Sequence, residues 1–125
     1  MNSLENLSPV GNDELLARFI RHKRHIREDM TVKPDAFIPH PHSDLSVIRH
    51  IGLNENELWD IGKSIIDRLH GRADINAIEV RNQKLLIEPT STPRNHANIT
   101  GWPPQKEAQK IIALELAVKA IFKSR

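Results

Sequence analysis

The strongest constraint on the fold comes from residues 104–123, where apolar side chains recur with the period of an α-helix. Pro104 suits the first helical position, because the amide that proline lacks would be unpaired there in any case. We expect such a helix to be mostly covered, by a sheet and by a protein partner or a second subunit. The apolar stripe comprises Ala108, Ile111, Leu114, Val118 and Ile121, and it is widened by Ile112, Leu116 and Ala120.

Two earlier segments also carry helical patterns. The first helix is predicted to start at Asn12 or Asp13, since either side chain can cap free backbone amides. The second is predicted to start after Asn54, which forms a capping-box pattern with Glu57, and to end near Gly71. The apolar face of the first helix would consist of Leu15, Leu16, Phe19 and Ile20.

Strand patterns lie between these helices. Residues 36–38 are predicted to form a short strand or an extended edge segment, and residues 45–49, rich in β-branched side chains, are predicted to form a strand. Two further strands are predicted at 75–80 and 84–88, with residues 81–83 short enough for a hairpin loop. A polar loop over residues 90–103 would lead to the last helix.

The element order α-β-β-α-β-β-α predicts a single small α+β domain with a mainly antiparallel sheet packed by helices. A chain of 125 residues fits one domain. Residues 1–11 are predicted to be a flexible N-terminal tail, because Ser8, Pro9 and Gly11 interrupt regular structure. The domain itself would then cover residues 12–125.

Composition excludes several classes of function. The chain has no cysteine, which excludes a disulfide scaffold, a cysteine nucleophile and a thiolate metal site. Its first residues lack the basic start and apolar run of a signal peptide, and no apolar stretch reaches membrane-spanning length. We therefore expect a cytoplasmic protein without a membrane partner.

The first candidate site is the loop around His96. This histidine is suited to act as a general acid or base near neutral pH, and Arg94 is suited to hold a phosphate or carboxylate. Asn95 and Asn98 would orient a substrate or stabilise a developing negative charge. Arg49, at the end of a predicted strand, completes the predicted catalytic set. The alternative is that these side chains only stabilise the loop.

The second candidate is a metal site in the run His40-Pro41-His42-Ser43-Asp44. In an extended segment alternate residues face the same side, so His40, His42 and Asp44 would point together. Two imidazoles and a carboxylate suit zinc or another divalent metal, the only cofactor that the sequence suggests. The alternative is a surface loop stiffened by proline.

The third candidate is a basic cluster between residues 18 and 27. Such a cluster is suited to contact the phosphates of nucleic acid, although the formal net charge of the whole chain is only +2. A solvated basic surface is the alternative, since no aromatic residues for base stacking are interleaved. The cluster consists of Arg18, Arg21, His22, Lys23, Arg24, His25 and Arg27.

Three functions follow from these features, and the sequence leaves all three open. The first is a protein-interaction or self-associating module that uses the last helix. The second is a small enzyme, a hydrolase or group transferase, that acts on an anionic or phosphate-bearing substrate through residues 94–98. The third is nucleic-acid binding through the basic cluster.

Overall fold

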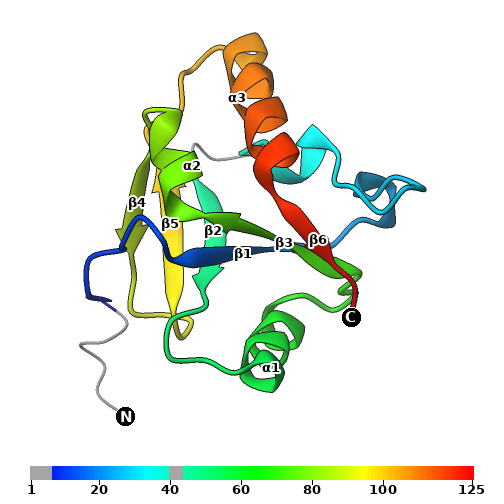
Figure 1. Cartoon of the computed structure of the whole chain (residues 1–125), viewed down its shortest axis with the longest axis vertical. Coiled ribbons are helices and arrows are strands. Elements are labelled where there is room, and N and C mark those ends of the chain that lie inside the picture. The colour runs from blue at the N-terminus through cyan, green and yellow to red at the C-terminus, as the bar shows by residue number, and fades with distance from the viewer. Residues whose placement is uncertain (1–6, 40–43) are drawn as a thin grey trace.

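The computed structural model describes residues 7–39 and 44–125. In this part of the chain six strands form one antiparallel sheet in the order β4-β5-β2-β1-β3-β6 (Figure 1). The predicted fold class, a small α+β domain with an antiparallel sheet packed by helices, is therefore confirmed. The strands are β1 (Leu15–Ile20), β2 (Leu45–Arg49), β3 (Gly71–Asn76), β4 (Leu86–Pro89), β5 (His96–Thr100) and β6 (Ile121–Lys123). The helices are α1 (Glu55–Ile65), α2 (Ala77–Asn82) and α3 (Lys106–Lys119), with short 3-10 turns at residues 23–25 and 34–37.

The prediction of a helix that starts at Asn12 or Asp13 is wrong, because these residues lead into β1 at the centre of the sheet. β1 pairs with β2 on one side and with β3 on the other. Leu16 and Ile20 enter one core, and Phe19 enters the core on the opposite face. A strand that is buried on both faces has no apolar–polar alternation, so its apolar run also fits a helical pattern.

The helices lie on both faces of the sheet. Figure 1 shows α2 and α3 on one side and α1 on the other. The larger core, which includes Phe37, Ile75 and Leu116, lies on the side of α2, α3 and the turn at 34–37. The smaller core, which includes Phe19 and Leu58, lies beneath α1. The sheet is thus covered unevenly, and the face that carries α1 leaves polar side chains of β2, β4 and β5 accessible.

Helix α1 begins as the sequence predicts. The Asn54 side chain accepts a hydrogen bond from the Glu57 amide at 2.8 Å, and the Glu57 side chain accepts one from the Asn54 amide at 3.0 Å. Both halves of the capping box are therefore formed. Gly62 lets α1 approach the sheet closely, because an added Cβ would lie only 2.5 Å from the Phe19 ring. The helix ends at Ile65, before the predicted stop at Gly71.

The predicted hairpin between 75–80 and 84–88 is wrong. β3 ends at Asn76 and α2 begins at Ala77, because the chain at residues 12–14 supplies acceptors for the first helical amides. The Ala77 amide donates to the Glu14 carbonyl and the Ile78 amide to the Asn12 carbonyl, each at 2.9 Å. The next strand, β4, pairs with β5 rather than with β3.

Three further segments differ from the prediction. Residues 36–38 belong mainly to a 3-10 turn that starts at a proline, instead of a strand. β5 lies inside the predicted polar loop, where buried Ala97 and Ile99 alternate with polar residues and pair with β2. The last helix ends at Lys119, and β6 then pairs with β3.

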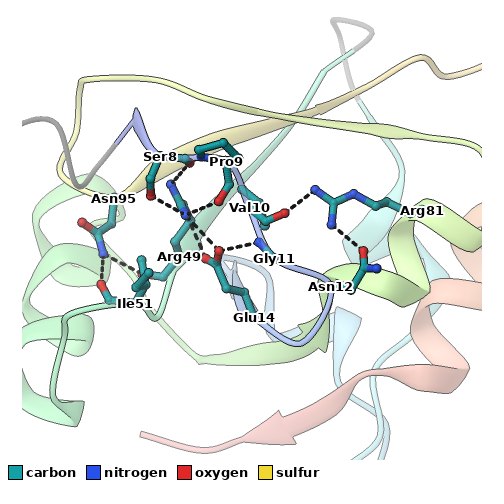
Figure 2. Close-up of polar contacts among 10 residues, drawn as sticks. All are labelled: Ser8, Pro9, Val10, Gly11, Asn12, Glu14, Arg49, Ile51, Arg81 and Asn95. Atoms are coloured by element: carbon teal, nitrogen blue, oxygen red, sulfur yellow. Dashed lines mark hydrogen bonds and ion pairs between the residues drawn. The ribbon is translucent and has the colours of Figure 1, made fainter.

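A buried arginine joins the segment before β1 to the sheet (Figure 2). Arg49 is fully buried and donates to both carboxylate oxygens of Glu14 at 2.9 Å. It also donates to the Ser8 carbonyl at 2.7 Å and to Pro9, while Arg81 donates to the Val10 carbonyl. Residues 8–10 are thus held by two arginines. The predicted domain boundary after residue 11 stays a prediction.

Candidate functional site

A basic cavity of about 630 Å³ lies where β1, β2, the two 3-10 turns and the start of α3 meet. Its size is that of a small-molecule site. The described residues that line it include five arginine or lysine side chains and two carboxylates. The cations are Arg18, Arg21, Arg24, Lys106 and Lys110, and the carboxylates are Asp35 and Asp44. The excess of positive charge favours an anionic ligand.

Arg18 occupies a special position in this cavity. Its Nε donates to the Ala36 carbonyl at 2.8 Å, and its Nη1 donates to the Ser46 carbonyl at 3.0 Å. These bonds orient the guanidinium between β1 and β2, but both acceptors are neutral. None of the ion pairs found among residues 7–39 and 44–125 involves Arg18. Its charge is therefore oriented, and no carboxylate among the described residues forms an ion pair with it.

The electrostatics of Arg18 are consistent with this arrangement. Burial, followed by the neighbouring Arg21, lowers the pKa of Arg18 to about 10. The guanidinium is still charged at neutral pH, and a bound anion would relieve both effects.

Two histidines lie beside the arginines. The rings of His22 and His25 meet edge to face with their centroids 5.0 Å apart, and both line the cavity. Burial, followed by His22, lowers the pKa of His25. His25 is therefore neutral at pH 7 and can exchange hydrogen bonds with a ligand without adding charge.

A hydrogen-bonded chain of three side chains lies on the other face of the sheet, the face that carries α1. Ser46 on β2 lies with its Oγ 2.7 Å from Nε2 of His96 on β5. The other ring nitrogen, Nδ1, lies 2.7 Å from Oγ1 of Thr90. Burial lowers the pKa of His96, so its imidazole is neutral at pH 7. Ser46 is exposed, and its carbonyl accepts from Arg18 of the basic cavity, whereas its hydroxyl lies with His96 on the face of the sheet that carries α1.

The structure brings together only part of the predicted catalytic set. His96 and Asn98 are two residues apart on β5, on the same face of the sheet. Asn95 is buried, and its amide donates to the carbonyls of Arg49 and Ile51 (Figure 2). The Arg49 side chain forms an ion pair with Glu14. Arg94 lies 3.5 Å from Glu57 of α1, a weak pairing. The catalytic roles assigned to these residues stay predictions.

The predicted metal site lies largely outside the described residues, since these exclude His40 and His42. Asp44 is described and lines the basic cavity. Within residues 7–39 and 44–125 there is no group of three or more histidine or acidic side chains arranged for a metal ion. The metal hypothesis thus stays a prediction.

The basic cluster predicted from the sequence separates into two parts. Arg18, Arg21 and Arg24 line the cavity, whereas Arg27 donates to the Val32 carbonyl in the following loop. Sequence reasoning missed Lys106, Lys110 and Ser46, because the fold brings them in from distant segments. The two lysines are four residues apart and so share one face of α3. The sequence alone does not show that this face lies beside the arginines.

No protein-family model matches the chain, and no curated protein or solved structure is significantly similar to it. In the described part of the chain no helix combines the length and the apolar character needed to cross a membrane.

Proposed function

We propose that this protein binds a phosphate-bearing ligand in the basic cavity. The observation that carries the proposal is the Arg18 guanidinium, which lines the cavity, is oriented by two backbone carbonyls and has no carboxylate partner among the described residues. Buried or half-buried arginines are usually paired, so an oriented arginine with an unneutralised charge favours an external anion.

Phosphate fits this site better than a carboxylate does. The planar fork of arginine N–H donors matches both groups, so the preference for phosphate comes from its higher negative charge and its larger number of acceptor oxygens. Arg21, Arg24, Lys106 and Lys110 add donors around the same space, enough for more than one phosphate oxygen. A cavity of about 630 Å³ also has room for the organic part of a phosphate ester.

Charge reversal at Arg21 and Lys110 is expected to abolish tight binding. Both side chains are exposed, so Arg21→Glu with Lys110→Glu should leave folding intact. The affinity for adenosine monophosphate, measured by isothermal titration calorimetry, should fall at least about tenfold, since charged hydrogen bonds are worth roughly 1.5–3 kcal/mol each. Lys63→Glu on α1 is the control, because Lys63 is exposed but does not line the cavity.

The same titration distinguishes the sources of the phosphate. Tighter binding of the mononucleotide than of a single-stranded oligonucleotide indicates a small-molecule site. Preference for the oligonucleotide, with an affinity that falls steeply with salt, indicates nucleic acid instead. Absence of binding to inorganic phosphate, mononucleotide and oligonucleotide alike would overturn the proposal.

A second candidate function is self-association through α3, supported by side chains that the fold leaves uncovered. The exposed fractions of Ile111, Leu114 and Val118 are 66%, 47% and 69%, and their spacing places them on one face of the helix. Contiguous exposed apolar patches often mark interaction surfaces. A second copy of the chain carries the same row, so a two-fold contact would cover both.

Replacing Val118 with glutamate tests this candidate. Sedimentation equilibrium is expected to show a dimer for the unaltered chain and a monomer for Val118→Glu, because a buried unpaired charge opposes the contact. The melting temperature measured at low protein concentration should be unchanged, since Val118 is exposed in one chain. Lys119→Ala, on an exposed neighbour, is the control. A monomeric unaltered chain at all concentrations contradicts self-association.

A further inference from the structure

Two histidines bring titratable side chains into the basic cavity. His22 and His25 flank the turn that follows β1, and the His25 amide donates to the His22 carbonyl at 3.0 Å. This bond closes the turn, and the two ring centroids lie 5.0 Å apart. Both side chains are half-buried and line the cavity. Of the residue types that line it, histidine is the one that ordinarily changes its charge between about pH 5 and pH 8.

The charged groups around the pair come from every element that borders the cavity. The loop before the turn at 34–37 also contacts the pair directly, because the Lys33 amide donates to the His25 carbonyl at 2.8 Å. Cations outnumber carboxylates among these groups, so the cavity disfavours a further positive charge on the rings. The groups are Arg18 and Arg21 at the end of β1, Arg24 in the turn itself, Asp35 in the turn at 34–37, Asp44 before β2, and Lys106 and Lys110 on α3.

These surroundings keep His25 uncharged at pH 7. Burial lowers the pKa of His25, and the neighbouring His22 adds to this effect. Arg18 and Arg24 lower the pKa further, whereas Asp35 opposes them. The arginine that orients its charge in the cavity therefore also acts on the His25 ring.

A bound phosphate would reverse this balance. A phosphate held by Arg18 offsets the positive charge that opposes protonation of His25, since a phosphate ester carries between one and two negative charges at neutral pH. A protonated imidazole donates from both ring nitrogens, so it adds a charge-assisted hydrogen bond to the anion. Phosphate and proton thus favour each other's binding, and by the same factor in each direction.

We propose that the pair of His22 and His25 couples phosphate binding to the uptake of a proton, so that the cavity binds phosphate esters more tightly on mild acidification. This inference rests on the proposed function, since it requires phosphate in the cavity. As the pH falls, the protonated fraction of the pair increases and the cavity gains positive charge. Two like charges 5.0 Å apart oppose each other, so the pair takes up one proton rather than two.

Isothermal titration calorimetry of the full chain with adenosine monophosphate tests the coupling. Titrations at pH 7 in buffers of different ionisation enthalpy give the number of protons taken up for each ligand bound. We expect the unaltered chain to take up about half a proton more than the double variant His22→Asn with His25→Asn. Its affinity relative to that of the variant should then rise about threefold for each unit by which the pH falls. Protonation of the ligand itself is common to both titrations and cancels in the comparison.

The matched control is His50→Gln. His50 lies at the opposite end of β1, where its amide donates to the Leu15 carbonyl, and glutamine keeps an N–H donor for Asp74. Proton uptake should equal that of the unaltered chain. The His22 and His25 side chains make no hydrogen bond within residues 7–39 and 44–125, so asparagine should be tolerated at both positions. Circular dichroism verifies the folding of each variant.

Nuclear magnetic resonance of the histidine rings measures the same coupling from the side of the proton. Saturation with adenosine monophosphate should raise the pKa of at least one of the two rings, His22 or His25, by about 1, the lower end of the effect of a nearby opposite charge. This measurement needs only the unaltered chain, so it decides the question even where the double variant binds too weakly to titrate.

The outcomes distinguish this inference from the proposed function. If adenosine monophosphate binds but leaves the pKa of both rings unchanged, the coupling is overturned and the binding function stands. Equal proton uptake by the unaltered chain and the double variant has the same meaning. Proton uptake that disappears in His50→Gln also overturns the coupling, since the proton would then be bound away from the cavity. Absence of binding to the unaltered chain overturns the proposed function and this inference together.

Discussion

Replacing Glu14 with glutamine is expected to lower the free energy of unfolding by about 3 kcal/mol, the lower end of the range for breaking a buried ion pair. Arg49 has no exposed surface, and Glu14 accepts hydrogen bonds from its Nε and Nη2. The backbone acceptors at Ser8 and Pro9 would remain, but the negative charge of Glu14 beside the buried guanidinium would be lost. Urea denaturation followed by circular dichroism measures the change.

The matched control is the exposed pair of Asp60 and Lys63 on α1. These side chains are 72% and 45% exposed and lie 3.5 Å apart, so Asp60→Asn should change the free energy of unfolding by less than about 0.5 kcal/mol. Equal effects of the two substitutions would mean that the contact between Arg49 and Glu14 does not hold the segment before β1 in place.

Replacing Asp74 with asparagine should have a comparable effect, again about 3 kcal/mol in the free energy of unfolding. Asp74 lies at the centre of a network beneath α1. It accepts from Arg72 Nε and from His50 Nε2, each at 2.9 Å, and Arg72 also bonds both carboxylate oxygens of Glu55 at 2.8 Å. The Arg72 guanidinium further lies 4.7 Å from the Trp59 ring. Since Arg72 is 1% exposed, losing one of its carboxylates leaves its charge poorly compensated.

The dependence of stability on pH provides a second measurement of the same network. Burial alone would raise the pKa of Asp74, but hydrogen bonds from His50 and Arg72 outweigh it, so the folded pKa lies below the usual value. A depressed pKa contributes stability above the unfolded pKa, about 3.9, and this contribution is lost as the pH falls through the folded value. The unaltered chain should therefore lose stability on acidification below about pH 4.

Asp74→Asn should weaken the dependence of the free energy of unfolding on pH below about 4, and it should also lower this free energy at pH 7. Asp67→Asn, which changes an exposed carboxylate in the loop after α1, should leave both unchanged. Parallel acid profiles for the unaltered chain and Asp74→Asn would show that the carboxylate does not contribute through its ionisation.

The fold class and the start of α1 were predictable because both depend on local signals. The capping box at Asn54 and Glu57 is a contact within four residues, and it forms as expected. β1 was not predictable in the same way, because its identity as a strand depends on pairing with β2 and β3. Helix α2 likewise depends on carbonyls of residues 12 and 14, which lie far away in the sequence.

The candidate site follows the same rule. The cluster of arginines was visible in the sequence, since Arg18, Arg21 and Arg24 are near neighbours. Its partners were not, because Lys110 enters from α3 and Ser46 from β2. His96 was selected for its chemistry in a segment predicted to be a loop. Its position on β5 beside Ser46 depends on a register that no local pattern encodes.

The position of each strand in the sheet also determines when it can pair with its neighbours while the chain is being synthesised. The two central strands, β1 and β2, are made first, and β3 then extends the sheet on one side. β4 has no neighbour in the sheet until β5 has been made, because β5 separates it from β2. The outer edge of β3 stays open until residues 121–123 emerge. The growing chain therefore presents unpaired strand edges on both sides of a finished centre, and these edges are the places where a partly made molecule can pair wrongly with another chain.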